Sequence, residues 1–452
     1  MGAAASSDFH RHQHLMSDLD RLVTRQHQLI HSAFKLSDGA LVHENTTEAE
    51  VLSRSIPPGS RCYVWKQDPT VARIGIRKVF LPHAIYPGPK DADIEVVLAL
   101  PAAAGAVPEK DVKATAIANP DDDHDFLCDI KGDPFCFDLV HTFTVARMTL
   151  DMYVRDLKID WKWNWDLNLA AGQKKTPLKI ICHAGEKPNA VYHRGKKALK
   201  FYYFTEGAST TYLCRSFDIV AHETGHAILD ALKPRLYSCH DGQAGALHEA
   251  FADLTAIFAI LDQLDMCEDI IAETKGDLRQ AKYLTAIGEQ FATAMKANEK
   301  DAYSRSEAET ETQEHAEVMG MRNANNTVTG KTCPPNDIYQ LCNVFTGFVF
   351  DCLVDIFLWE RNPKYETSDA VTLNRVARSV RRMLLLALFE SSDVPSYLEL
   401  AKGMASAAKV IARNDPGDVV KYQKIIDEHR HKRCLAVAGL PDKVEEEVDL
   451  NY

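Results

Sequence analysis

Ser216 to Pro234 reads S-F-D-I-V-A-H-E-T-G-H-A-I-L-D-A-L-K-P and contains an H-E-x-x-H sequence between His222 and His226. Apolar residues recur at helical spacing, Ser216 is suited to cap the start of a helix, and Pro234 is suited to end it. Residues four apart lie on one face of a helix, so both imidazoles can reach the same metal ion. Glu223 then stands beside them, facing the same water.

A second stretch, Gly245 to Leu264, bears on the same site because its apolar stripe predicts another helix. Glu249 and Asp253 lie off that stripe, four residues apart, on a shared face. A catalytic zinc needs a third ligand and a carboxylate that orients a ligand histidine. A single H-E-x-x-H can arise by chance, and these two carboxylates favour a genuine metal site over a chance match.

The order H-E-x-x-H, then E-x-x-x-D on the next helix, resembles that of the thermolysin-like zinc metallopeptidases, the gluzincins. The resemblance implies one zinc ion bound by His222, His226 and Glu249. It also implies that Glu223 is the general base and that Asp253 is the partner of a ligand histidine.

Further residues match the family's pattern by position. Tyr237, eleven residues after the second histidine, resembles the tyrosine that helps to hold the transition-state oxyanion. Asn189 and Ala190 resemble the edge-strand pair that holds an extended substrate through its main chain. Arg322 resembles the arginine that binds the peptide carbonyl on the leaving-group side. Each has a plain alternative: a half-buried tyrosine, a turn asparagine and a surface arginine.

Tyr339 stands where the family has a histidine that stabilises the oxyanion. A phenol can donate one hydrogen bond but cannot carry the positive charge of a protonated imidazole, and loss of a comparable donor costs roughly 10²–10³-fold in rate. His240, near Tyr237, is the candidate substitute by position. We therefore expect either a tyrosine-assisted peptidase with reduced or specialised activity, or a zinc protein that has partly lost it.

The rest of the chain predicts an α+β fold, and the resemblance implies two thermolysin-like lobes with the zinc helix at their junction. Short β-branched and aromatic runs over 62–116 and 178–204 predict strands, whereas the sequence after Leu264 is almost wholly helical. The expected parts are an N-terminal extension (1–55), a mixed α/β lobe (56–234), a mainly helical lobe with the third ligand (235–440) and an acidic tail (441–452).

Composition limits the classes of partner. Apolar content of 46% and charged content of 26% are ordinary for a globular protein, and a net charge of −12 argues against nucleic-acid binding. The longest apolar run, Val96 to Val107, is broken by Pro101 and is too short to span a bilayer.

The acidic loop Asp121–Asp123 leaves a calcium site possible but unsupported. A peptide or protein substrate is the partner that the resemblance implies, and the oligomeric state is not predicted.

The 11 cysteines and the start of the sequence bear on location. The number is odd, there is no C-x-x-C pair, and no apolar signal segment stands at the N-terminus. We therefore expect reduced thiols and a cytoplasmic location. Gly2 formally matches the loose N-myristoylation pattern, although a merely disordered start accounts for it better.

The main functional hypothesis is zinc-dependent hydrolysis of peptide bonds, with Glu223 as general base. The alternative is a weakened or inactive homologue that binds a peptide or a protein without turnover. A purely structural zinc is disfavoured, because such sites fill four protein ligands, usually including cysteine.

Overall fold

The computed structural model describes residues 59–71, 73–99, 117–170, 172–206, 209–239, 242–287, 322–334, 337–361, 368–412 and 416–439. The chain divides into two compact units, Met1–Pro57 and Pro58–Tyr452, and every described residue belongs to the second. The predicted N-terminal extension, the Gly2 pattern and the predicted acidic tail therefore lie outside the described residues. Within the second unit, helices and small sheets are combined, which confirms the α+β class.

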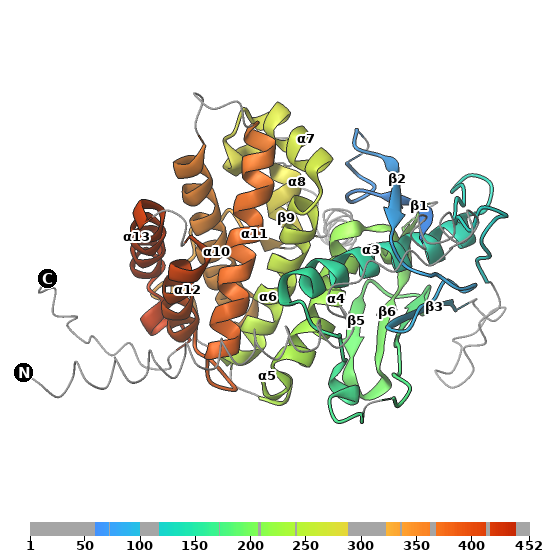
Figure 1. The fold of residues 1–452 in the computed structure, drawn as a ribbon, viewed down its shortest axis with the longest axis horizontal. Coiled ribbons are helices and arrows are strands. Elements are labelled where there is room, and N and C mark those ends of the chain that lie inside the picture. The colour runs from blue at the N-terminus through green and yellow to red at the C-terminus, as the bar shows by residue number, and fades with distance from the viewer. Residues whose placement is uncertain are drawn as a thin grey trace, which may run out of the picture. The chain divides into compact units, whose positions relative to one another are not determined.

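The strands form one four-stranded sheet and several antiparallel pairs (Figure 1). The four-stranded sheet has the order β3-β4-β6-β5, and β5 is antiparallel at its edge. Most side chains of β3 and β4 are buried, because α3 packs against both strands. The strands here are β1 (Ser60–Trp65), β2 (Ile76–Leu81), β3 (Ile94–Leu98), β4 (Leu178–Cys182), β5 (Ala190–His193), β6 (Ala198–Phe201), β7 (Tyr203–Glu206) and β8 (Ser209–Tyr212).

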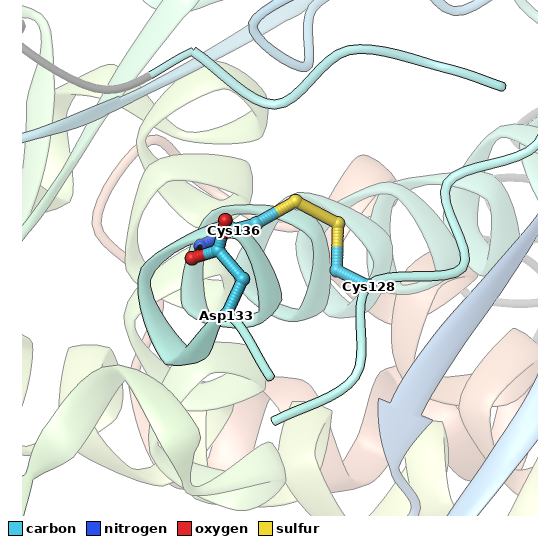
Figure 2. The surroundings of a disulfide bond; sticks show 3 residues. All are labelled: Cys128, Asp133 and Cys136. Carbon is cyan, nitrogen blue, oxygen red and sulfur yellow. Dashed lines mark hydrogen bonds between the residues drawn. A yellow bond between two sulfur atoms is a disulfide. The ribbon is translucent and has the colours of Figure 1, made fainter. Parts of the chain in front are cut away.

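Helix α3 (Pro134–Leu157) begins where the sequence supplies a cap. The Asp133 side chain accepts a hydrogen bond from the Cys136 N–H, and Pro134 occupies the first turn, where its missing N–H is not needed. Figure 2 shows Asp133 beside a disulfide that joins Cys128 to Cys136. The bond ties the preceding loop to the first turn of α3.

The disulfide corrects one expectation from the sequence. Cys128 and Cys136 are paired, so the prediction of uniformly reduced thiols is wrong, although the nine other cysteines are free. The two cysteines are eight residues apart, and this spacing is not a C-x-x-C pattern. Because disulfides are typical of oxidising compartments, one basis of the predicted cytoplasmic location is removed. The location itself stays a prediction.

The H-E-x-x-H stretch is a helix, α4 (Phe217–Leu232), as predicted, and α5 (Pro234–Ser238) follows it. Ser216 occupies the cap position, but its hydroxyl donates to Asp68 Oδ2 instead of capping α4. The second predicted helix is α6 (Gly242–Leu261), which begins and ends three residues earlier than expected. α4 packs against both β5 and α6.

The remaining helices form a mainly helical C-terminal part. A two-stranded pair, β9 (Ala286–Ile287) with β10 (Arg322–Asn323), interrupts the predicted run of helices. Two helices, α6 and α10, are apolar and long enough to cross a membrane by composition, yet 89% and 83% of their apolar windows are buried, as in core helices. The helices of this part are α7 (Leu264–Thr274), α8 (Lys282–Thr285), α10 (Ile338–Glu360), α11 (Asp369–Glu390), α12 (Tyr397–Ile411) and α13 (Pro416–Lys432).

Gly225, inside the H-E-x-x-H motif, lets α4 and α6 approach closely. A Cβ atom added there would lie 2.9 Å from Cβ of Thr255 and 3.0 Å from Cα of Ala252. Thr255 is held in place because its hydroxyl donates to the Phe251 carbonyl and accepts from the Tyr153 phenol, each at 2.7 Å. Thr255 therefore cannot move away from an added Cβ atom without loss of these hydrogen bonds.

We predict that Gly225→Ala lowers the free energy of unfolding by about 1–2 kcal/mol, because the clash outweighs the gain in helix propensity. Gly245→Ala is the matched control in α6. The nearest atom to its added Cβ would be Cδ1 of Ile338 at 3.5 Å, an ordinary contact, so this change should stabilise by up to about 1 kcal/mol. Urea unfolding of both variants measures the difference, and equal effects would contradict the prediction.

Candidate metal centre

Three side chains from α4 and α6 converge as the motif predicts. Nε2 of His222 and Nε2 of His226 each lie 3.6 Å from a different carboxylate oxygen of Glu249. One ligand atom from each residue lies within 4.8 Å of the others. Nitrogen and oxygen ligands about 2.0–2.1 Å from a tetrahedral zinc lie roughly 3.3–3.4 Å apart. The observed separations are close to this spacing and are too long for hydrogen bonds.

His222 is oriented from behind by a buried carboxylate. Its Nδ1 lies 2.9 Å from Oδ1 of Asp253, whose side chain is fully buried. The Cys342 thiol donates to the other oxygen of Asp253 at 3.3 Å. This arrangement keeps the His222 proton on Nδ1 and leaves Nε2 available to a metal ion. Asp253 thus lies where the resemblance implied it, as a partner of a ligand histidine.

His226 is oriented by His248, a residue that the sequence analysis missed. The two Nδ1 atoms lie 3.1 Å apart. If Nε2 of His226 binds a metal, its Nδ1 carries the proton and donates it to His248. Burial lowers the pKa of His248 to about 4, so this imidazole is neutral at pH 7 and can accept. The only signal in the sequence was its place directly before Glu249.

A cavity of about 440 Å³ has His222, His226 and Glu249 in its lining. Glu223 and the other predicted residues Asn189, Ala190, Tyr237 and Tyr339 all line it. A carboxylate beside the ligands, in a concave site of ordinary size for a ligand pocket, is what proton transfer to or from a bound molecule requires. The structure thus brings these predicted site residues to one place.

The two tyrosines differ in their surroundings. The ring of Tyr237 packs edge-on against Tyr192 and His248, with centroids 5.6 and 5.7 Å apart. Tyr339 is 59% exposed and lies in the first turn of α10, which Asp337 caps by accepting from the N–H groups of Tyr339 and Gln340. Tyr237, at 38%, is the less exposed of the two tyrosines.

Asn189 and Ala190 lie where an extended ligand can reach main-chain groups. β5 is an edge strand that pairs with β6 alone among the described strands, through partners such as Ala190 and Phe201. Asn189 directly precedes it, is exposed, and its carbonyl accepts from the Tyr202 N–H. An open strand edge beside the cavity fits recognition of an extended peptide by strand addition.

Two predicted candidates are not placed in the site. The backbone of Arg322 lies in β10, paired with Ile287, and its side chain is outside the described part of the structure. His240, the candidate substitute for a second oxyanion donor, also lies outside the described residues. Both assignments remain predictions.

A second cluster of possible ligands consists of Asp138, His183 and Cys214, all buried. Arg215 donates to both carboxylate oxygens of Asp138 at 2.6 and 2.9 Å, and Nε2 of His183 lies 2.8 Å from one of them. These are hydrogen-bond distances, and the guanidinium already neutralises the carboxylate. We interpret the cluster as an ion-pair network that ties α3 to the residues before α4.

We predict that His248→Leu weakens zinc binding by about 10–100-fold, because His226 loses the acceptor that orients it. His248→Asn offers an amide oxygen as acceptor and should stay closer to the wild type. Competition with a chromophoric chelator measures both affinities. Equal losses in the two variants would show that the acceptor does not matter.

We also predict a pH-dependent loss of stability from the Asp138 network. Burial is the largest single influence on His183 and lowers its pKa, but the hydrogen bonds and charge interactions with Asp138 and Cys214 together outweigh it and raise the pKa to about 9. The folded pKa exceeds the unfolded value, so the stabilisation is complete below pH 6.5 and is lost as the pH rises through about 9. The free energy of unfolding should fall by up to about 3 kcal/mol over this window. In His183→Gln the decrease in the free energy of unfolding that comes from His183 should be absent. If the free energy of unfolding depends on pH in the same way in the variant and the wild type, the prediction is wrong.

Compared with known proteins, the chain matches no protein-family model and no curated protein sequence. The resemblance to thermolysin-like peptidases therefore stays an expectation drawn from the motif residues.

Proposed function

We propose that this protein is a zinc-dependent peptidase of the thermolysin-like type, which hydrolyses peptide bonds in a cavity between a mixed α/β lobe and a mainly helical lobe. The observation that carries the proposal is the approach of both His222 and His226 to Glu249 at 3.6 Å, beside Glu223 in an open cavity. No fourth histidine, cysteine or carboxylate joins this ligand group among the described residues. Three protein ligands with an open position are typical of catalytic rather than structural zinc.

Zinc bound by these residues would polarise the scissile carbonyl and lower the pKa of a bound water to near 7. Glu223, on the same helix as the two histidines, is placed to take the water proton and pass it to the leaving nitrogen. The phenol of Tyr237 is the hydrogen-bond donor to the developing oxyanion. These roles follow from position in the cavity and from the resemblance.

The substrate that fits best is an extended peptide. Its main chain would pair with the free edge of β5, and its side chains would enter a cavity whose walls include Leu213, Ile219 and Leu236. Apolar walls favour an apolar side chain on the leaving-group side. Arg322 stays the proposed contact of the peptide carbonyl, by resemblance alone.

A non-catalytic peptide-binding protein is the second candidate, and Tyr339 favours it. The described histidines that line the cavity are His222, His226 and His248. The first two are proposed ligands and the third orients one of them. No lysine or arginine is among the described residues that line the cavity, so the transition state would have weaker stabilisation.

The experiment that separates the candidates uses zinc-loaded protein, a diverse peptide mixture and mass spectrometry. We expect cleavage by the wild type. In Glu223→Gln, bound zinc should be retained and the cleavage rate should fall by at least about 10²-fold, because the amide cannot accept the proton. Undiminished cleavage by the variant would remove Glu223 as the base. Peptide binding without cleavage by the zinc-loaded wild type would favour the binding protein.

A further inference from the structure

We infer that Arg194 is a positioning residue, which fixes Tyr237 beside the metal cavity and joins it to the strand that would hold the substrate. The inference rests on the proposed function, because it assigns Arg194 an effect on turnover that acts through the Tyr237 hydroxyl. Arg194 follows β5 directly, as the first residue of the 3₁₀ turn Arg194–Lys196.

The Arg194 guanidinium contacts both ends of α5. Its Nη2 donates to the carbonyl of Pro234, the first residue of that helix, and its Nη1 donates to Oγ of Ser238, the last, at 2.9 Å. A helix of five residues has little stability of its own. The place of Tyr237, which α5 carries, therefore depends on contacts of this kind.

The same guanidinium lies over the face of the Tyr237 ring, 4.2 Å from its centroid. A cation–π contact of this geometry contributes about 0.5–1 kcal/mol at a partly exposed site. Because Tyr192 and His248 pack edge-on against the ring, three side chains restrict its orientation. These ring contacts hold the phenol on one side of the cavity.

Asp230 anchors Arg194 to the metal-binding helix. It lies on α4 one turn after His226, and its side chain is fully buried. Arg194 donates to both oxygens of its carboxylate, from Nε to Oδ2 at 2.8 Å and from Nη2 to Oδ1. The Tyr192 phenol donates to the same carboxylate at 2.6 Å. One buried carboxylate thus connects β5, α4 and, through Arg194, α5.

Lysine cannot reproduce this set of contacts. A guanidinium is planar, so it can stack on the ring while its fork binds the carboxylate, whereas an ammonium is a point charge on a flexible stem. Arg194→Lys therefore keeps the charge beside Asp230 and removes the stacking and the fork. It is the mildest change that frees Tyr237.

The test is a double-mutant cycle with Tyr237→Phe, which keeps the ring and removes the hydroxyl. We expect Arg194→Lys alone to lower kcat by about 10–100-fold with little change in KM, because misplacement of a transition-state donor affects the chemical step. In the Tyr237→Phe background the same change should alter kcat by less than about threefold. Zinc affinity should stay unchanged in both backgrounds.

Arg215→Lys is the matched control. Arg215 also forms a fork with a buried aspartate, Asp138, and lies over a tyrosine ring, that of Tyr212, at 4.4 Å. It does not contact Tyr237. Its effect on kcat, whatever its size, should be the same in both backgrounds.

The outcomes separate the inference from the proposed function. Suppose that the wild type cleaves peptides, that Glu223→Gln abolishes cleavage, and that Arg194→Lys has equal effects in both backgrounds. This result would overturn the positioning role of Arg194 and leave the proposed peptidase function intact. A wild type that binds zinc but cleaves nothing would overturn both. If Arg194→Lys does not fold, Ser238→Ala removes one of its contacts to α5 and should give a smaller loss in kcat, again only where the Tyr237 hydroxyl is present.

Discussion

The close contact between α4 and α6 is the constraint on which the rest of this structure depends. The two candidate ligand histidines, His222 and His226, come from one helix and Glu249 comes from the other, so the separation of the helix axes sets how closely the three side chains approach. Gly225 lies between the histidines and faces Thr255, whose hydroxyl is bonded to Phe251 and Tyr153. The absence of one methyl group in the motif therefore lets Glu249 come close to His222 and His226.

Two fully buried aspartates support this contact in different ways. A buried carboxylate is costly unless hydrogen bonds and opposite charge compensate it. Asp253 on α6 is compensated by His222 and by the Cys342 thiol, and so it acts directly on a candidate metal ligand. Asp230 on α4 is compensated by Arg194 and Tyr192, and so it acts on the wall of the cavity. The centre is thus fixed both at its ligands and at the strand where a substrate would lie.

The sequence predicts those parts of the site that depend on local spacing. The four-residue intervals from His222 to His226 and from Glu249 to Asp253 become neighbours on a helix wherever that helix goes. It does not predict contacts between distant elements. Arg194 and Asp230 are 36 residues apart, and nothing in their local pattern indicates that they pair. The pairing of β9 with β10 also joins distant residues, such as Ile287 and Arg322, so local spacing does not predict it. The Cys128–Cys136 bond is local, but its spacing of eight residues is not a recognised pairing pattern.

The arrangement around Tyr237 bears on how a site with Tyr339 in place of a histidine would stabilise negative charge. A protonated imidazole acts by charge as well as by hydrogen bonding, and Arg194 brings a positive charge to the face of the Tyr237 ring. However, the Asp230 carboxylate binds that guanidinium on both oxygens, so the pair carries little net charge toward the cavity. Arg194 therefore does not replace the missing imidazolium electrostatically. What it supplies is a fixed position for the Tyr237 phenol, and an oxyanion donor is effective to the extent that its position is fixed before the charge develops.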